Sequence, residues 1–246
     1  MELLYKLFLI IFLFSSNVFS IDYSSYANFL KKYVKGGLVL YENSIKDKDK
    51  SLDNFLNELK NVNFDGYDYN EKMAVYINAY NACTIKLILD SYPVDSIKDI
   101  GSIFQSPWSK KICNIGGKTY TLDEIEHDIL RKDFKTPLIH FALNCASKSC
   151  PVLADTPYLP EQLFIQMLQA AKKYINDKNN NYIEGDILYL SSLFKWYKED
   201  FADVLDFVSE LMSESERKYL SRNKNQIKIK YLKYDWGLNE YKKSRP

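Results

Sequence analysis

Apolar residues recur at helical spacing in three successive segments of the first half of the chain. Residues 23–34 and 51–62 each carry large apolar side chains three or four positions apart, and Ser51 is placed to cap the second segment. Residues 70–91, which end before Pro93, are apolar on nearly every side. We therefore expect two amphipathic helices followed by a long, buried central helix.

Short strand-like segments and glycine turns follow Pro93. Gly116-Gly117 and Gly185-Asp186 are two-residue turn sequences that favour β-hairpins. The strands are expected at residues 111–115 with 118–121, 182–184 with 187–191, 137–143 and 227–232. The sequence thus predicts two hairpins and two further strands.

Helical segments also occur among these strands. Thr121 and Glu124 have the spacing of a capping box, which would open a helix that runs through about Arg131. Residues 160–177 have an amphipathic pattern, and further helices are expected within residues 192–222.

The order of these elements predicts the fold class. Helices come first and hairpin strands later, without regular alternation, which is typical of α+β proteins. The low numbers of Gly (8) and Pro (7) indicate packed structure without a linker. We expect one mainly helical α+β domain over residues 21–246, with a small antiparallel sheet built from the late hairpins around the buried central helix.

The N-terminus has the features of a secretory signal peptide. Lys6 precedes the apolar run of residues 7–14, which is too short to span a membrane. Val18 and Ser20 occupy the positions that flank a cleavage site. We expect cleavage before Ile21 and a secreted or periplasmic protein; an uncleaved anchor is the alternative.

The charge balance excludes one class of partner. Lys and Arg total 33 against 32 Asp and Glu, so no global field favours nucleic acid. The sequence has neither a Gly-rich phosphate loop nor a serine-hydrolase elbow. We expect an unidentified small-molecule or peptide ligand, no nucleic acid, no cofactor, and no membrane span after signal cleavage.

Polar residues interrupt two of the apolar helical segments. Asn78 and Asn81 lie three positions apart in the central helix, where each buried amide needs a hydrogen-bond partner. They either tie down a neighbouring segment or stabilise an oxyanion. Glu126 lies at the edge of an apolar stripe, where its carboxylate can reach inward, and His127 lies farther round. A solvated helix face is the alternative for these two.

Residues 140–151, HFALNCASKSCP, combine one of only two histidines in the chain with two of its four cysteines. Cys145 and Cys150 are close enough in sequence to form a disulfide. Together with His140 they offer zinc ligands, but no CxxC or HExxH motif accompanies them. A third interpretation makes Cys145 a nucleophile and His140 its base, although an extended chain would hold the two apart. The spacing leaves the three interpretations open.

Several segments together resemble the family called domain of unknown function 547. They are YINAYNACTIKLIL, YPVDSIKDIG, LDEIEHDILR, HFALNCASKSCP, LYLSSLFKWYKEDF and YLKYDWGLN. The resemblance runs from about residue 38 to residue 239 and implies export from bacteria, but no particular activity. Cys83 and Cys113 depart from the motifs and are either small core residues or a lineage-specific pair. The positions that match the motifs are Asn78, Asn81, Glu126, His127, His140, Cys145 and Cys150.

These residues favour a thiol hydrolase or transferase of papain- or transglutaminase-like logic. Cys145 would attack an acyl carbon, His140 would act as the base, and Glu126 would orient the imidazole. Asn81 or a backbone N–H within residues 144–149 would stabilise the oxyanion.

The sequence also predicts binding residues and leaves two alternative functions open. Asn78, Asn81, Cys150 and His127 are assigned to binding, and no residue is assigned to a metal. One alternative is a non-catalytic envelope protein whose Cys145–Cys150 disulfide shapes a ligand-binding loop. The other is a redox or metal-binding role.

Overall fold

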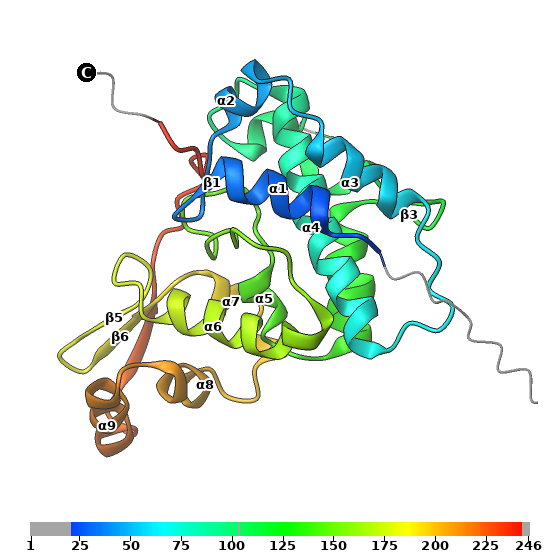
Figure 1. The fold of residues 1–246 in the computed structure, drawn as a ribbon. Helices are drawn as coiled ribbons and strands as arrows, with labels where there is room; N and C mark the ends of the chain where they lie inside the picture. Colours follow the sequence, from blue (N-terminus) through cyan, green and yellow to red (C-terminus); the bar gives the residue numbers. More distant parts are fainter. Residues whose placement is uncertain (1–20, 103, 243–246) are drawn as a thin grey trace, which may run out of the picture.

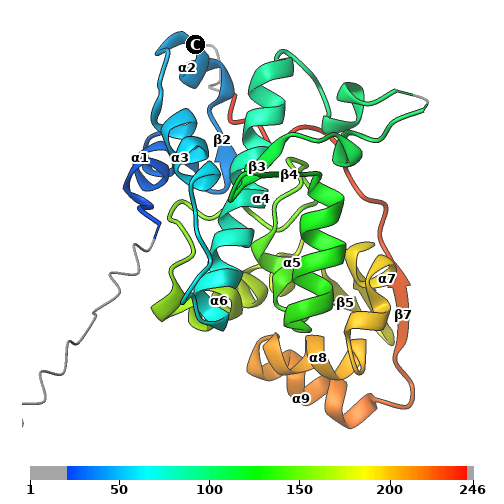
Figure 2. The same ribbon diagram turned by 90° about the vertical axis from the view of Figure 1, so that its right-hand side faces the viewer.

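A computed structural model describes residues 21–102 and 104–242, so the predicted signal peptide lies outside the described residues. Figures 1 and 2 show the chain from two sides. The α-helices are α1 (Ser24–Tyr33), α2 (Tyr41–Lys46), α3 (Ser51–Lys60), α4 (Tyr69–Ser91), α5 (Ile139–Ala142), α6 (Leu163–Ile175), α7 (Leu193–Trp196), α8 (Val204–Leu211) and α9 (Glu214–Asn223). Short 3-10 helices are η1 (Ile97–Ile100), η2 (Pro107–Ser109), η4 (Pro160–Gln162) and η5 (Lys198–Asp200), and η3 (Glu124–Phe134) is a π-helix. The strands are β1 (Val34–Lys35), β2 (Leu38–Val39), β3 (Cys113–Ile115), β4 (Lys118–Tyr120), β5 (Tyr182–Glu184), β6 (Ile187–Leu190) and β7 (Lys228–Tyr231). The described chain is mainly helical with small sheets, which confirms the predicted α+β class.

Helix α4 runs through the middle of the molecule, as its all-round apolar pattern predicts (Figure 1). Asp68 and Glu71 cap its start with reciprocal hydrogen bonds, which satisfy backbone donors of the first turn. The helix packs against α3, η3 and β3. One hydrophobic cluster extends from Tyr26 to Leu238, so residues far apart in the sequence share the core around α4.

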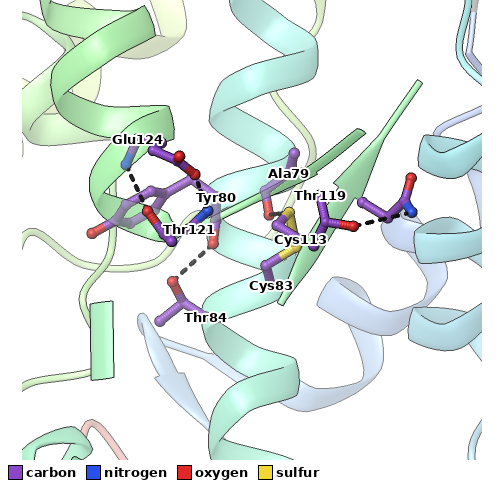
Figure 3. Close-up of a disulfide and its surroundings, with 9 residues drawn as sticks. Ala79, Tyr80, Cys83, Thr84, Cys113, Thr119, Thr121 and Glu124 are labelled. Atoms are coloured by element: carbon purple, nitrogen blue, oxygen red, sulfur yellow. Dashed lines mark hydrogen bonds between the residues drawn. A yellow bond between two sulfur atoms is a disulfide. The ribbon is translucent and has the colours of Figure 1, made fainter. Parts of the chain in front are cut away.

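A disulfide between Cys83 and Cys113 joins α4 to β3 (Figure 3). Both residues are almost completely buried, and 30 positions separate them in the sequence. The interpretation of these two cysteines as a pair is therefore confirmed. Thr84, one residue farther along α4, donates a hydrogen bond to the carbonyl of Tyr80. The bridge thus fixes β3 beside the part of α4 that carries Tyr80.

The strands of the described residues form three small sheets. The hairpins β3-β4 and β5-β6 are antiparallel, as predicted, and β1-β2 is an additional antiparallel pair. One detail differs from the expectation of a wholly antiparallel sheet, because β7 joins β6 in parallel. The chain travels through α7, α8 and α9 between these two strands, and a connection of that length permits parallel pairing.

Residues 137–143 do not form the predicted strand. They contain the short helix α5, followed by extended backbone at Leu143. Every residue from Leu138 to Leu143 is buried, so no polar position marks a solvent-facing side. A short apolar run of this kind is equally consistent with a buried helix. The helical turn shortens the path between His140 and Cys145 compared with a fully extended segment.

Helix η3 begins at the capping box that the sequence predicts. The Thr121 backbone N–H donates to Glu124, and the Glu124 backbone N–H donates to the Thr121 hydroxyl. The helix extends beyond the predicted end at Arg131 and winds as a π-helix. It ends at Lys135, whose φ of 48° is left-handed. A π-helix of this length is unusual, since π-winding appears mostly as single-turn bulges inside α-helices.

The late helices and the C-terminal segment complete the molecule. The amphipathic pattern of residues 160–177 gives η4 and α6, and residues 192–222 give α7, α8 and α9. In both views the chain after β7 runs back from the end that carries α9 toward β1 (Figures 1 and 2). Backbone bridges join Val39 to Glu240 and Ser147 to Leu238. Within the described residues, no helix has the length and hydropathy needed to cross a bilayer.

Candidate functional site

A pocket with a volume of ≈ 180 Å³ lies where α4, η3, α5, α7 and the C-terminal segment meet. Glu126, His127, His140, Cys145 and Cys150 all line it. Residues predicted from separate motifs therefore converge on one place. The remaining lining residues are Tyr80, Trp108, Asp123, Leu143, Pro151, Leu193, Trp196, Tyr197, Tyr234 and Trp236.

The loop of residues 144–150 presents the two thiols to this pocket, and the side chain of Asn144 holds the loop in shape. Its amide oxygen accepts a hydrogen bond from the backbone N–H of Ala146, and its amide nitrogen donates to the carbonyl of Pro151. Ala146 has a φ of 57°, a left-handed conformation that an alanine adopts only at a cost. The Asn239 amide also donates to Asn144, at 3.1 Å. The loop is thus fixed by buried amides rather than by a covalent bridge.

Asn78 and Asn81 both use their amides on neighbouring backbone. Asn78 donates to the carbonyl of Tyr158 at 2.7 Å and accepts from the N–H of the same residue at 2.9 Å. Asn81 donates to the carbonyl of Ala142 at 2.9 Å and accepts from the N–H of Asn144 at 2.8 Å. Neither residue lines the pocket. Asn81 acts on the site through the loop, because it holds the chain on the N-terminal side of Cys145.

The C-terminal segment brings a phenol to the thiols. The backbone N–H of Lys148 donates to the carbonyl of Gly237, and the N–H of Asn239 donates to the carbonyl of Ala146. This pairing places the hydroxyl of Tyr234 3.2 Å from the Sγ of Cys145. Sequence reasoning missed Tyr234, although it belongs to the motif YLKYDWGLN, because nothing local connects that motif to the cysteines.

Cys145 and Cys150 have opposite pKa shifts. Their Sγ atoms lie 2.8 Å apart without a covalent bond, and the Sγ of Cys145 also lies 3.1 Å from the hydroxyl of Ser147. The hydrogen bond with Cys150 lowers the pKa of Cys145 most, and those with Ser147 and Tyr234 lower it further against burial and the charge of Glu126. Burial raises the pKa of Cys150 well above its usual range. Cys145 is therefore the thiol that ionises first.

His140 is oriented by a carboxylate that the sequence did not suggest. Its Nε2 lies 2.6 Å from the Oδ2 of Asp200. An ionised carboxylate can only accept, so Nε2 carries the proton and Nδ1 of the neutral ring is left as the basic nitrogen. The ring also stacks on Tyr197, with centroids 4.0 Å apart. His140 and Cys145 line the same pocket, but no hydrogen bond joins them among the described residues.

Asp200 is itself held by a guanidinium. Arg131 donates to both carboxylate oxygens, at 2.6 and 2.8 Å. Burial alone would raise the pKa of Asp200, but the hydrogen bonds from His140 and Arg131 outweigh it and hold that pKa well below its usual range. Asp200 is thus an anion at any pH at which the thiol ionises. It stands in the motif LYLSSLFKWYKEDF, from which no site residue was predicted.

His127 occupies a different position from His140. Its Nδ1 lies 3.1 Å from a terminal nitrogen of Arg131. A guanidinium only donates, so Nδ1 accepts and the imidazole is neutral in this arrangement. His127 therefore connects the rim of the pocket to the Arg131–Asp200 pair.

No hydrogen bond joins Glu126 to His140 among the described residues, and Glu126 is instead the hydrogen-bond partner of Tyr197. Only 7% of the residue is exposed, and it lines the pocket. Burial and the negative charge of Glu126 raise the pKa of the Tyr197 hydroxyl, which therefore stays protonated and donates to the carboxylate. Within the described ranges, no Lys or Arg forms a salt bridge with Glu126. The role of orienting the imidazole thus falls to Asp200, and Glu126 is a buried carboxylate without a cation.

The described residues contain no cluster of three His, Cys, Asp or Glu side chains that could hold a metal ion. Each histidine ring uses one nitrogen in a hydrogen bond to the Arg131–Asp200 pair, so that nitrogen is not free to bind a metal.

Comparison with known proteins gives one match. The family described as "Protein of unknown function, DUF547" matches residues 64–175. These residues form a DUF547 domain. The matched residues include α4, η3, α5 and the loop of residues 144–150, whereas Asp200 and Tyr234 lie beyond them. No curated protein and no solved structure matches the chain.

Proposed function

We propose that this protein is a cysteine-dependent acyl hydrolase or transferase, with Cys145 as the nucleophile and His140 as the base. One observation carries the proposal: the thiol with the lowered pKa lines the same pocket as a histidine whose Nε2 is fixed by a half-buried carboxylate. A nucleophile, a base and a group that orients the base are the parts that thiol catalysis requires. This arrangement follows papain-like logic, with Asp200 as the orienting group.

The chemistry would proceed in two steps. His140 accepts the thiol proton on Nδ1, and the Cys145 sulfur attacks the acyl carbon to form a thioester while the leaving group takes the proton from the imidazolium. Water or an amine then attacks the thioester and frees the thiol. The hydroxyl of Tyr234, which comes from the C-terminal segment, lies 3.2 Å from the Cys145 sulfur. It is therefore placed to stabilise negative charge near that sulfur.

Export is part of the same proposal. The apolar run of residues 7–14 and the small residues before Ile21 support cleavage of a signal peptide and a secreted or periplasmic location. The disulfide between Cys83 and Cys113 supports it independently, because such bonds persist in oxidising compartments. N-terminal sequencing of the exported protein should begin at IDYSSYANF; a retained Met1 in the membrane fraction would replace export with anchoring.

Alkylation by iodoacetamide, followed by mass spectrometry of the non-reduced protein, tests the nucleophile. Cys145 should react fastest, because its thiolate fraction is the larger of the two thiols, and Cys83 and Cys113 should not react at all. His140→Ala should slow alkylation of Cys145, because it removes the base that the proposal assigns to the thiol proton. His127→Ala, a matched change in the same pocket, should have a smaller effect. An alkylation rate that is indifferent to His140 would remove the base from the proposal.

A second candidate function is supported by a different observation. The Sγ atoms of Cys145 and Cys150 are only 2.8 Å apart, so a non-catalytic ligand-binding protein with a disulfide in this loop requires little movement. The same experiment separates the two functions. If neither thiol is alkylated until a reductant is added, the disulfide candidate replaces the enzyme.

A further inference from the structure

Aromatic rings form much of the pocket wall. All three tryptophans of the chain, Trp108, Trp196 and Trp236, line the pocket. The ring of Trp236 lies 5.6 Å from that of Trp108 and 5.7 Å from that of Trp196, measured between centroids. Tyr234 adds a ring 4.6 Å from Trp236. Such faces carry the negative end of the ring quadrupole, which attracts cations.

Apart from its two histidines, the charged side chains that line the pocket are all acidic. Asp123 and Glu126 line it, and the lining contains no Lys or Arg. A buried carboxylate is normally paired with a cation, because removal of a charge from water is costly. Tyr197 gives Glu126 a hydrogen bond but no countercharge. Among the described residues, no Lys or Arg lines the pocket or forms a salt bridge with Glu126.

The nearby cations do not fill this role. Arg131 is engaged by Asp200 and Glu199, and His127 is neutral in its contact with Arg131. The ammonium of Lys98 lies 3.8 Å from the ring centre of Trp236, but Lys98 does not line the pocket. That contact shows that the tryptophan cluster accepts an ammonium on a ring face.

We propose that the pocket binds the ammonium group of a cationic acyl substrate, with Glu126 opposite the charge and the three tryptophans around it. The inference rests on the proposed function, because it names the substrate class of the same site: an ester, thioester or amide with a primary or methylated ammonium near the reacting carbonyl. The volume of ≈ 180 Å³ is below that of pockets that enclose whole drug-sized ligands, so the site admits a side chain or a head group.

Binding can be measured apart from catalysis in the full chain with the substitution Cys145→Ala. Choline and 3,3-dimethyl-1-butanol have the same shape and differ in charge, so they form a matched pair of probes for isothermal titration calorimetry. Choline should bind at least about tenfold more tightly than the alcohol, because both the carboxylate and the ring faces favour a cation. Equal affinities, or no binding of choline, would overturn the inference.

Variants locate the site. Glu126→Gln should weaken choline binding by about tenfold, because it removes the charge while it keeps the shape. Asp128→Asn removes the same charge from an exposed position of the same helix, so it is the control and should leave affinity unchanged. Trp196, with 47% of its surface exposed, can be replaced without loss of core packing. Trp196→Leu should weaken choline by about threefold. Equal losses in the Glu126 and Asp128 variants would place choline elsewhere.

The failure of this inference is distinguishable from the failure of the proposed function. Selective alkylation of Cys145 in a protein that does not bind choline would retain the nucleophile and discard the cationic substrate. Choline binding in a protein whose Cys145 is inert would retain the ammonium pocket and leave it to a non-catalytic binding protein.

Discussion

The two cysteine pairs of this chain differ in the properties that govern thiol chemistry. Cys83 and Cys113 are bonded to each other in the core between α4 and β3, 30 positions apart in the sequence. Cys145 and Cys150 are unbonded and face a pocket, where hydroxyl and thiol donors surround one sulfur. The first pair has the environment of a structural link, whereas the second has an environment in which a thiolate is stabilised. Four identical residue types thus have two different environments, which are set by their positions in the fold.

Loss of the disulfide should have the largest effect on folding. A loop closed over 30 positions is expected to stabilise the fold by about 3–4 kcal/mol. The double variant Cys83→Ser with Cys113→Ser should lose about this amount of unfolding free energy in urea. Alkylation of Cys145 in the folded variant should keep its wild-type rate, because the bridge lies outside the pocket lining. A changed rate would mean that the two pairs are coupled.

The two buried asparagines offer the next comparison. Asn78→Leu and Asn81→Leu should each lower the unfolding free energy by about 2 kcal/mol, because each leaves a backbone donor and acceptor unpaired inside the protein. Only Asn81 holds the loop that carries Cys145. We therefore expect alkylation of Cys145 to change in the Asn81 variant and to stay constant in the Asn78 variant. Thermal midpoints equal to wild type in both variants would contradict the structural role of these amides.

Local signals made much of the fold predictable. The capping box at Thr121, the glycine turns of the hairpins and the apolar helix α4 each depend on residues within a few positions of one another. Residues 137–143 were predicted wrongly because burial on every side erased the alternation that separates a strand from a helix.

The site was less predictable because its partners are distant in the sequence. Asp200 lies 60 positions from His140, and Tyr234 lies 89 positions from Cys145. Motifs indicated residues with unusual chemistry, so His140, Cys145 and Glu126 could be proposed from the sequence, but only the folded chain shows which carboxylate faces which ring. The disulfide pairing could not be predicted from the sequence either, since four cysteines allow several connectivities.

The smallest effect we predict concerns the pH at which Cys145 reacts. The hydrogen bond with Cys150 is the largest cause that lowers the pKa of Cys145, so the midpoint of its alkylation profile should lie at lower pH than that of an unperturbed cysteine. Once Cys145 is a thiolate, the Cys150 thiol can donate to it, and Cys150→Ala removes that contact. The midpoint should then move to higher pH, because the thiolate loses its strongest stabilising contact. Ser147→Ala removes a weaker donor and should move the midpoint in the same direction by less. Rates of iodoacetamide labelling across pH 5–9 measure all three midpoints. A shift to lower pH in the Cys150 variant would show that Cys150 suppresses ionisation of Cys145, and it would make the second pair a latent disulfide rather than an activated nucleophile.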